Sequence, residues 1–84
     1  MPTISRFYGL SVKMYFKGSE HNPPHIHVLY GECMGAINIK TRELMEGDLP
    51  GRALILTAEW IKDHEAELLD MWNTQKIKEI PPLE

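Results

Sequence analysis

The chain has 84 residues, of which 43% are hydrophobic and 25% are charged, and its formal net charge at neutral pH is -3. A chain of this length has apolar material for one core only, which predicts a single domain over residues 1–84 and excludes a disordered or low-complexity protein. The acidic balance disfavours a protein that works mainly by binding nucleic-acid phosphates, because such domains are usually basic.

The N-terminal half has the pattern of an antiparallel sheet. Residues 18–24, which contain two prolines, are predicted to form a loop, and residues 31–33 are predicted to form a hairpin connection. Alternation of apolar and polar residues, with glycine at the turns, predicts strands over residues 4–8, 10–17, 25–30 and 34–39, and a short fifth strand over residues 43–46. Gly47-Asp48 is predicted to end the strand region.

The C-terminal half has the pattern of one long helix. Pro50 suits a first helical turn, and neither proline nor glycine occurs between Gly51 and about Lys76. Its apolar residues, which include Trp60 and Trp72, fall on one half of the helical wheel. The fold class is therefore α+β: an antiparallel sheet of four or five strands followed by one long C-terminal helix packed on one face. A break in this helix near Asp63 is allowed by the pattern.

The length of this helix has a consequence for its first turns. At about 1.5 Å per residue it measures roughly 40 Å, which exceeds the width of a sheet of four or five strands. Ile55 and Leu56 also point away from the main apolar stripe, so that the first turns are apolar almost all round. Two interpretations are open: a homodimer through the long helix, in which a second subunit covers these turns, and scattered apolar side chains of the kind that is normal on a surface.

The most unusual stretch is His21-Asn22-Pro23-Pro24-His25-Ile26-His27-Val28, which holds three of the four histidines. The alternation of a strand places Ile26 and Val28 on the face that the helix covers. His25 and His27 then lie on the opposite face. Lys13, Tyr15 and Asn38 are expected beside them.

Three interpretations of this stretch are open. Histidines at positions i and i+2 of a strand converge on one side, so that His21, His25 and His27 together have the donors of a metal site, although no orienting carboxylate is evident. The second is general acid and base catalysis by the imidazoles. In the third, the two prolines only fix a turn and the histidines are ordinary strand residues.

The second interpretation points to metal-independent cleavage of RNA. His25 and His27 would act as acid and base, with His21 or Lys13 aiding the phosphate. Candidate binding residues around them are Tyr15, Lys17, Asn22 and Asn38. No metal or other cofactor is required by this mechanism, and none is predicted.

The single cysteine and the N-terminal residues bear on the cellular compartment of the protein. Cys33 cannot form an internal disulfide, which fits a reducing compartment. The first residues lack the apolar core of a signal peptide, and no stretch approaches the roughly 18 apolar residues of a membrane span. We expect a cytoplasmic protein without a membrane partner.

A family resemblance rests on residues along nearly the whole chain. They are Met1-Pro2-Thr3-Ile4-Ser5-Arg6-Phe7-Tyr8-Gly9, Met14-Tyr15-Phe16, the histidine stretch His21–Val28, Gly47-Asp48-Leu49-Pro50, Glu59-Trp60 and His64. With these residues the chain resembles the bacterial family catalogued as domain of unknown function 4160. Similar proteins are small and often encoded beside another short uncharacterised protein, which implies a toxin-antitoxin or regulatory pair. The segment Gly18-Ser19-Glu20-His21 is also similar to part of HicA-like mRNA interferase toxins.

The functional prediction follows from these observations together. The first expectation is a component of a bacterial toxin-antitoxin-like or regulatory pair that acts through protein contacts, with a protein partner encoded nearby. The alternative is a metal-independent ribonuclease that uses the histidines on the open sheet face. A DNA-binding regulator is a third alternative, which the absence of a helix-turn-helix pattern and the acidic net charge disfavour.

Overall fold

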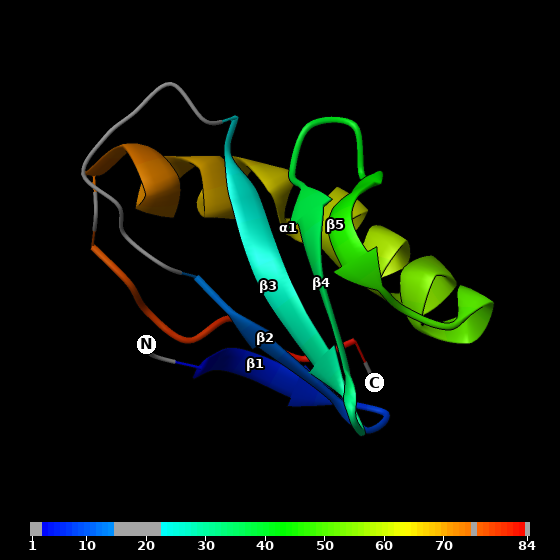
Figure 1. Ribbon diagram of the computed structural model, residues 1–84. Coiled ribbons are helices and arrows are strands. Elements are labelled where there is room, and N and C mark those ends of the chain that lie inside the picture. Colours follow the sequence, from blue (N-terminus) through cyan, green and yellow to red (C-terminus); the bar gives the residue numbers. More distant parts are fainter. Residues whose placement is uncertain (1–2, 15–22, 75, 84) are drawn as a thin grey trace.

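A computed structural model describes residues 3–14, 23–74 and 76–83. It contains five antiparallel strands in the order β1-β2-β3-β4-β5, followed by one helix (Figure 1). The predicted α+β fold, including the fifth strand, is confirmed. The elements are β1 (Thr3–Phe7), β2 (Leu10–Lys13), β3 (His25–Tyr30), β4 (Cys33–Asn38), β5 (Leu44–Asp48) and α1 (Gly51–Thr74).

The fifth strand differs from its prediction in extent. β5 includes Gly47 and Asp48, which the sequence pattern placed after the strand. Gly47 pairs with Gly35 of β4, and the register of these two strands shifts between Ala36 and Ile37. The shift and the two facing glycines let the strands stay paired where a turn was predicted.

The core lies between α1 and one face of the sheet. As predicted, Ile26 and Val28 are on that face. Val12, Ile37 and Ile39 lie there too, and each of the five is at most 1% exposed. From the helix, the buried residues are Ala53, Thr57, Trp60, Ile61, Leu68 and Met71. The apolar face that alternation gives the strands thus packs against the apolar face that the 3.6-residue period gives the helix.

The helix is kinked at a single residue. His64 has φ -126° and ψ 20°, which are not helical values, and so the helix bends close to the predicted position near Asp63. The His64 ring lies 5.4 Å from the Trp60 ring, measured between centroids, and its Nδ1 is 3.2 Å from Glu67 Oε1. These contacts hold the bend against the core.

Residues 76–83, called the tail below, return from the end of α1 to β1 (Figure 1). Ile80 is 3% exposed, and its backbone N–H donates to the Ile4 carbonyl oxygen at 2.9 Å. Trp60 Nε1 donates to the Pro81 carbonyl oxygen, also at 2.9 Å. The sequence pattern made no prediction for these residues, which belong to no helix or strand.

An ion pair joins the tail to the helix. Lys78 Nζ lies 3.2 Å from Glu67 Oε2. The hydrogen bond with Lys78, and then that with His64, lowers the pKa of the Glu67 carboxyl below its ordinary value. The pair lies at the surface, so that its contribution to the stability of the fold is small.

The helix is longer than the sheet is wide. Its 24 residues span about 36 Å, whereas five strands place the two outer strands roughly 19 Å apart. Figure 1 shows the first turns of α1 extending past β5. Ile55 in these turns is 63% exposed. In the described part of the chain, α1 is not apolar enough along its length to cross a membrane.

Candidate functional site

Two of the candidate histidines come together at the start of β3. The rings of His25 and His27 lie 5.2 Å apart between centroids in an edge-to-face arrangement. Both are partly buried, whereas the intervening Ile26 is completely buried on the other face. The alternation of the strand therefore places the two imidazoles side by side, as the sequence predicts.

His25 is fixed in one tautomer by the chain that precedes it. Its Nδ1 lies 2.9 Å from the carbonyl oxygen of Pro23. A carbonyl oxygen can only accept a hydrogen bond, so Nδ1 carries the proton and Nε2 is the basic nitrogen of the neutral ring. Pro24 holds the chain in this position as well, because its own carbonyl oxygen accepts the backbone N–H of Ile39.

His25 also lies against the helix. Its ring centroid is 5.1 Å from that of Trp72, in the last turns of α1. β2 ends at Lys13, which pairs with His27, so His25 lies one step past β2 at a corner of the sheet that the helix reaches. The sequence pattern predicted an open face for both histidines. It did not show the contact of His25 with Trp72, because the pattern gives no position for the end of the helix.

The contact between the two rings limits what they can do together. At 5.2 Å between centroids, the edge of one imidazole touches the face of the other. No phosphoryl group fits between rings in such contact. The arrangement therefore favours His25 acting as a single base through Nε2 over two histidines that bracket one phosphate.

The other candidate residues have different outcomes. Lys13 pairs with His27 in the register of β2 and β3, and so the two side chains share a face. Asn38 pairs with His25, but its Oδ1 accepts the backbone N–H groups of Lys40 and Thr41. Asn38 thus shapes the turn after β4. The remaining candidates, His21, Tyr15, Lys17 and Asn22, lie outside the described residues.

The metal interpretation needs three donors at one place. Within residues 3–14, 23–74 and 76–83, no group of three or more histidine, cysteine, aspartate or glutamate side chains is arranged to hold a metal ion. His25 and His27 supply two nitrogens, and His21 is outside these ranges.

The register of the strands defines a charged face that the sequence pattern did not show. The sheet face turned away from the core, called the open face below, carries two cross-strand rows. One row is Lys13, His27, Ala36 and Glu46, and the other is Arg6, Ser11, Leu29, Met34 and Asp48. Cations therefore lie toward β1 and β2, and carboxylates lie on β5.

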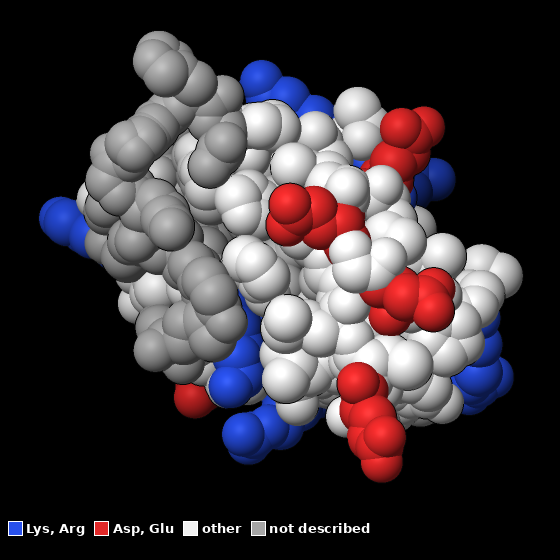
Figure 2. Space-filling model, in the orientation of Figure 1, with Lys and Arg blue, Asp and Glu red and all other residues white. Residues whose placement is uncertain are grey.

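The open face also carries the apolar side chains of Leu29, Met34 and Ala36, on the side of the sheet away from the helix. Met34 is 51% exposed there, between Leu29 and Asp48 in its row. Figure 2, which views the molecule from this side, shows acidic side chains separated by uncharged surface over the β4 and β5 side. Glu46 and Asp48 take no part in an ion pair with any cation in the described chain. Only the pairing of β4 with β5 could have revealed that they share a face with Met34.

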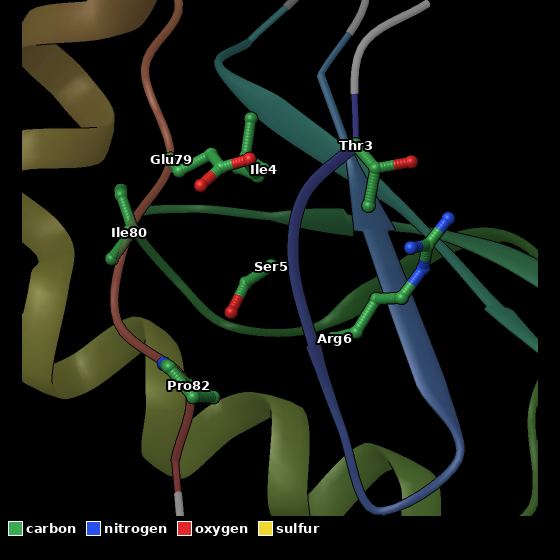
Figure 3. Close-up of a pocket in the computed structure, with 7 residues that line it drawn as sticks. All are labelled: Thr3, Ile4, Ser5, Arg6, Glu79, Ile80 and Pro82. Carbon is green, nitrogen blue, oxygen red and sulfur yellow. The ribbon is translucent and has the colours of Figure 1, made fainter.

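A hollow between β1 and the tail is a second feature of the surface. Its volume is about 260 Å³, and it is lined by Thr3, Ile4, Ser5, Arg6, Glu79, Ile80 and Pro82. Figure 3 shows Ser5 on the side of the tail, whereas the Arg6 and Thr3 side chains point away from it. Ser5 is 8% exposed, and its Oγ has no hydrogen-bond partner among the described residues. One hydroxyl without a charged group beside it does not define a ligand.

The comparisons with known proteins identify one family model. The family described as domain of unknown function (DUF4160) matches residues 9–73, which include β2 through most of α1. No curated protein and no solved structure matches the chain. β1 and the tail, which contact each other, both lie outside the matched residues.

Proposed function

This chain belongs to the domain of unknown function 4160 family, whose description states no activity, and on that premise we propose a function from the surface alone. We propose that it is a protein-binding component of a toxin-antitoxin-like or regulatory pair, and that its open face contacts a partner encoded nearby. The observation that carries the proposal is Met34, a large flexible apolar side chain of β4 that is 51% exposed on the open face. Methionine is common at surfaces that bind several partners, because its flexible side chain adapts to different shapes.

Charge on the open face supports contact with a protein rather than with nucleic acid. Carboxylates of Glu46 and Asp48 lie on the same side of the sheet as Met34. Phosphates would be repelled from this half of the face, and Arg6 and Lys13 are the cations that the described residues place on the other half. A helix-turn-helix of a DNA-binding regulator needs two helices, and the described residues contain one.

Co-expression tests the proposal. The chain and the product of the adjacent gene, both without histidine tags, should elute together from a gel-filtration column. Met34→Lys should weaken the complex at least about tenfold, because it replaces an apolar side chain of the proposed contact with a charged one. Ala66→Lys adds the same charge on the exposed side of α1 and should leave binding within about twofold. Separate elution of the two wild-type proteins would reject the proposal.

A second candidate function is RNA cleavage by a single histidine base. The hydrogen bond from His25 Nδ1 to Pro23 favours it, because a fixed tautomer leaves Nε2 as a base with a defined direction. If the chain is a ribonuclease, His25→Ala should reduce cleavage of a fluorogenic RNA by about 100-fold or more. His64→Ala, at a histidine that contacts Glu67 and Trp60, serves as the matched control. No cleavage above background by the wild-type chain would exclude this candidate.

The predicted homodimer through the long helix stays a prediction. It would use the exposed Ile55 and the half-buried Leu56 in the first turns of α1. The cytoplasmic location is likewise a proposal, which the single half-buried cysteine, Cys33, supports.

A further inference from the structure

The two edges of the sheet differ in how they are covered. At the β1 edge, the tail donates a backbone hydrogen bond to Ile4, and Ile80 is buried beside it. At the other edge, β5 has four exposed residues and one half-buried residue, and the described chain places no strand beyond it. The outward N–H and C=O groups of an outer strand without a neighbour are a template for a further strand.

Figure 1 shows that the helix continues where the sheet stops. The first turns of α1 extend past β5, so the layer opposite them is incomplete. Leu54 and Leu56 in these turns are only half-buried, whereas Ala53 between them on the wheel is completely buried. A sixth strand paired with β5 would lie over these turns and cover apolar surface that the five strands leave uncovered.

The two sides of β5 differ in chemistry. Leu44 is half-buried and packs against the core. Glu46 and Asp48 are exposed on the open face, in register with Ala36 and Met34. Because side chains of neighbouring strands that share a face pair with one another, a sixth strand would need apolar residues on the helix side and basic residues on the open side.

The same charges argue against a second copy of this chain at the edge. If two copies of β5 paired, the Glu46 and Asp48 carboxylates of each copy would lie beside those of the other. Like charges directly opposite each other in a sheet are destabilising. A basic segment has the complementary charge.

We propose that β5 binds an extended segment of the partner protein, which adds a sixth strand to the sheet and alternates lysine or arginine with valine, isoleucine or leucine. Main-chain hydrogen bonds supply the general affinity in this kind of recognition, and the alternating side chains supply the specificity. The inference rests on the proposed function, because it names the chemistry of the segment through which the partner is held.

A synthetic peptide tests the edge directly. The probe is an end-blocked peptide of nine residues that alternates lysine and valine, and a peptide that alternates glutamate and valine is its control. Binding is measured by fluorescence anisotropy, and protection of each backbone amide from hydrogen exchange is measured by NMR. We expect the lysine peptide to bind and to protect the backbone amides of Leu44–Asp48 but not those of Thr3–Phe7. The affinity of the glutamate peptide should be at least about tenfold lower.

A charge-reversed chain completes the test. The double variant Glu46→Lys, Asp48→Lys should bind the lysine peptide at least about tenfold more weakly than the wild type and should bind the glutamate peptide more tightly. Glu59→Lys with Asp63→Lys makes the same change in charge at exposed positions of α1 and should change either affinity by no more than about twofold. Equal weakening by both double variants, or binding without added protection of β5, would overturn the proposal. Self-association that protects β5 in the chain alone would assign the edge to a second copy and would also overturn it.

The outcomes also separate this inference from the proposed function. If the co-expressed complex forms and the Glu46→Lys, Asp48→Lys chain binds the partner as tightly as the wild type, the edge inference is wrong and the proposed function stands. If no complex forms but the lysine peptide adds to β5, the proposed partner is wrong and the edge inference stands.

Discussion

A chain that ends at Thr74 should lose about 3 to 5 kcal/mol of its free energy of unfolding. The tail supplies Ile80, which is 3% exposed, and burial of an isoleucine side chain contributes about 1.5 to 3 kcal/mol. It also accepts the hydrogen bond of Trp60 Nε1 through Pro81 and donates one to Ile4. Each such bond contributes roughly 1 kcal/mol.

This loss is large relative to the free energy of unfolding that we expect for the whole chain. A chain of this length has a free energy of unfolding of about 4 to 13 kcal/mol, so the shortened chain should be partly or wholly unfolded at 37 °C. Urea denaturation followed by tryptophan fluorescence measures the change. Lys78→Ala in the full-length chain removes only the surface ion pair with Glu67 and should shift the midpoint little. An unchanged urea midpoint in the truncated chain would show that the tail is not part of the fold.

Truncation also bears on the family match, which covers residues 9–73. β1 and the tail lie outside it, yet Ile4, Phe7 and Ile80 are core residues, and the Phe7 ring is 5.6 Å from that of Trp60. A protein that contains only the matched residues would leave Trp60 uncovered on two sides. The matched segment is therefore not expected to fold by itself.

Gly47→Ala should cost about 2 to 4 kcal/mol and detach β5 from the sheet. Gly47 has φ +83°, a backbone conformation that residues with a Cβ rarely adopt. A Cβ at this position would also overlap the Met34 carbonyl oxygen and approach Gly35 Cα to 2.9 Å. Both groups belong to the backbone of β4, which cannot move aside as a flexible side chain can.

Gly31→Ala is the matched control for this prediction. Gly31 has φ +60° as well, but a Cβ there would meet no atom within 4 Å. It should therefore cost only the strain of the left-handed conformation, about 1 kcal/mol. The difference between the two variants in urea denaturation isolates the overlap with β4. If both variants lost the same stability, the close approach of the two strands at Gly47 would be refuted.

The histidine stretch shows which features of the site can be predicted from the sequence and which cannot. Alternation correctly placed Ile26 in the core and brought His25 and His27 to the same side of β3. It gave no indication that Pro23 would fix the His25 tautomer or that Trp72 would lie against its ring. Those contacts join residues that are not related by the period of a single element. The described part of the stretch, residues 23–28, is thus a corner of the sheet packed against the helix.

The amino-acid sequence by itself determined the order and type of the elements and the side of each that faces the core. The reason is that the strand period of two and the helix period of 3.6 are local properties that apolar residues record along the chain. Only the tertiary structure decided the open face, the covered β1 edge and the uncovered β5 edge. Which residues share a row depends on strand register, and register arises when turns, a bulge and the returning tail bring distant segments together.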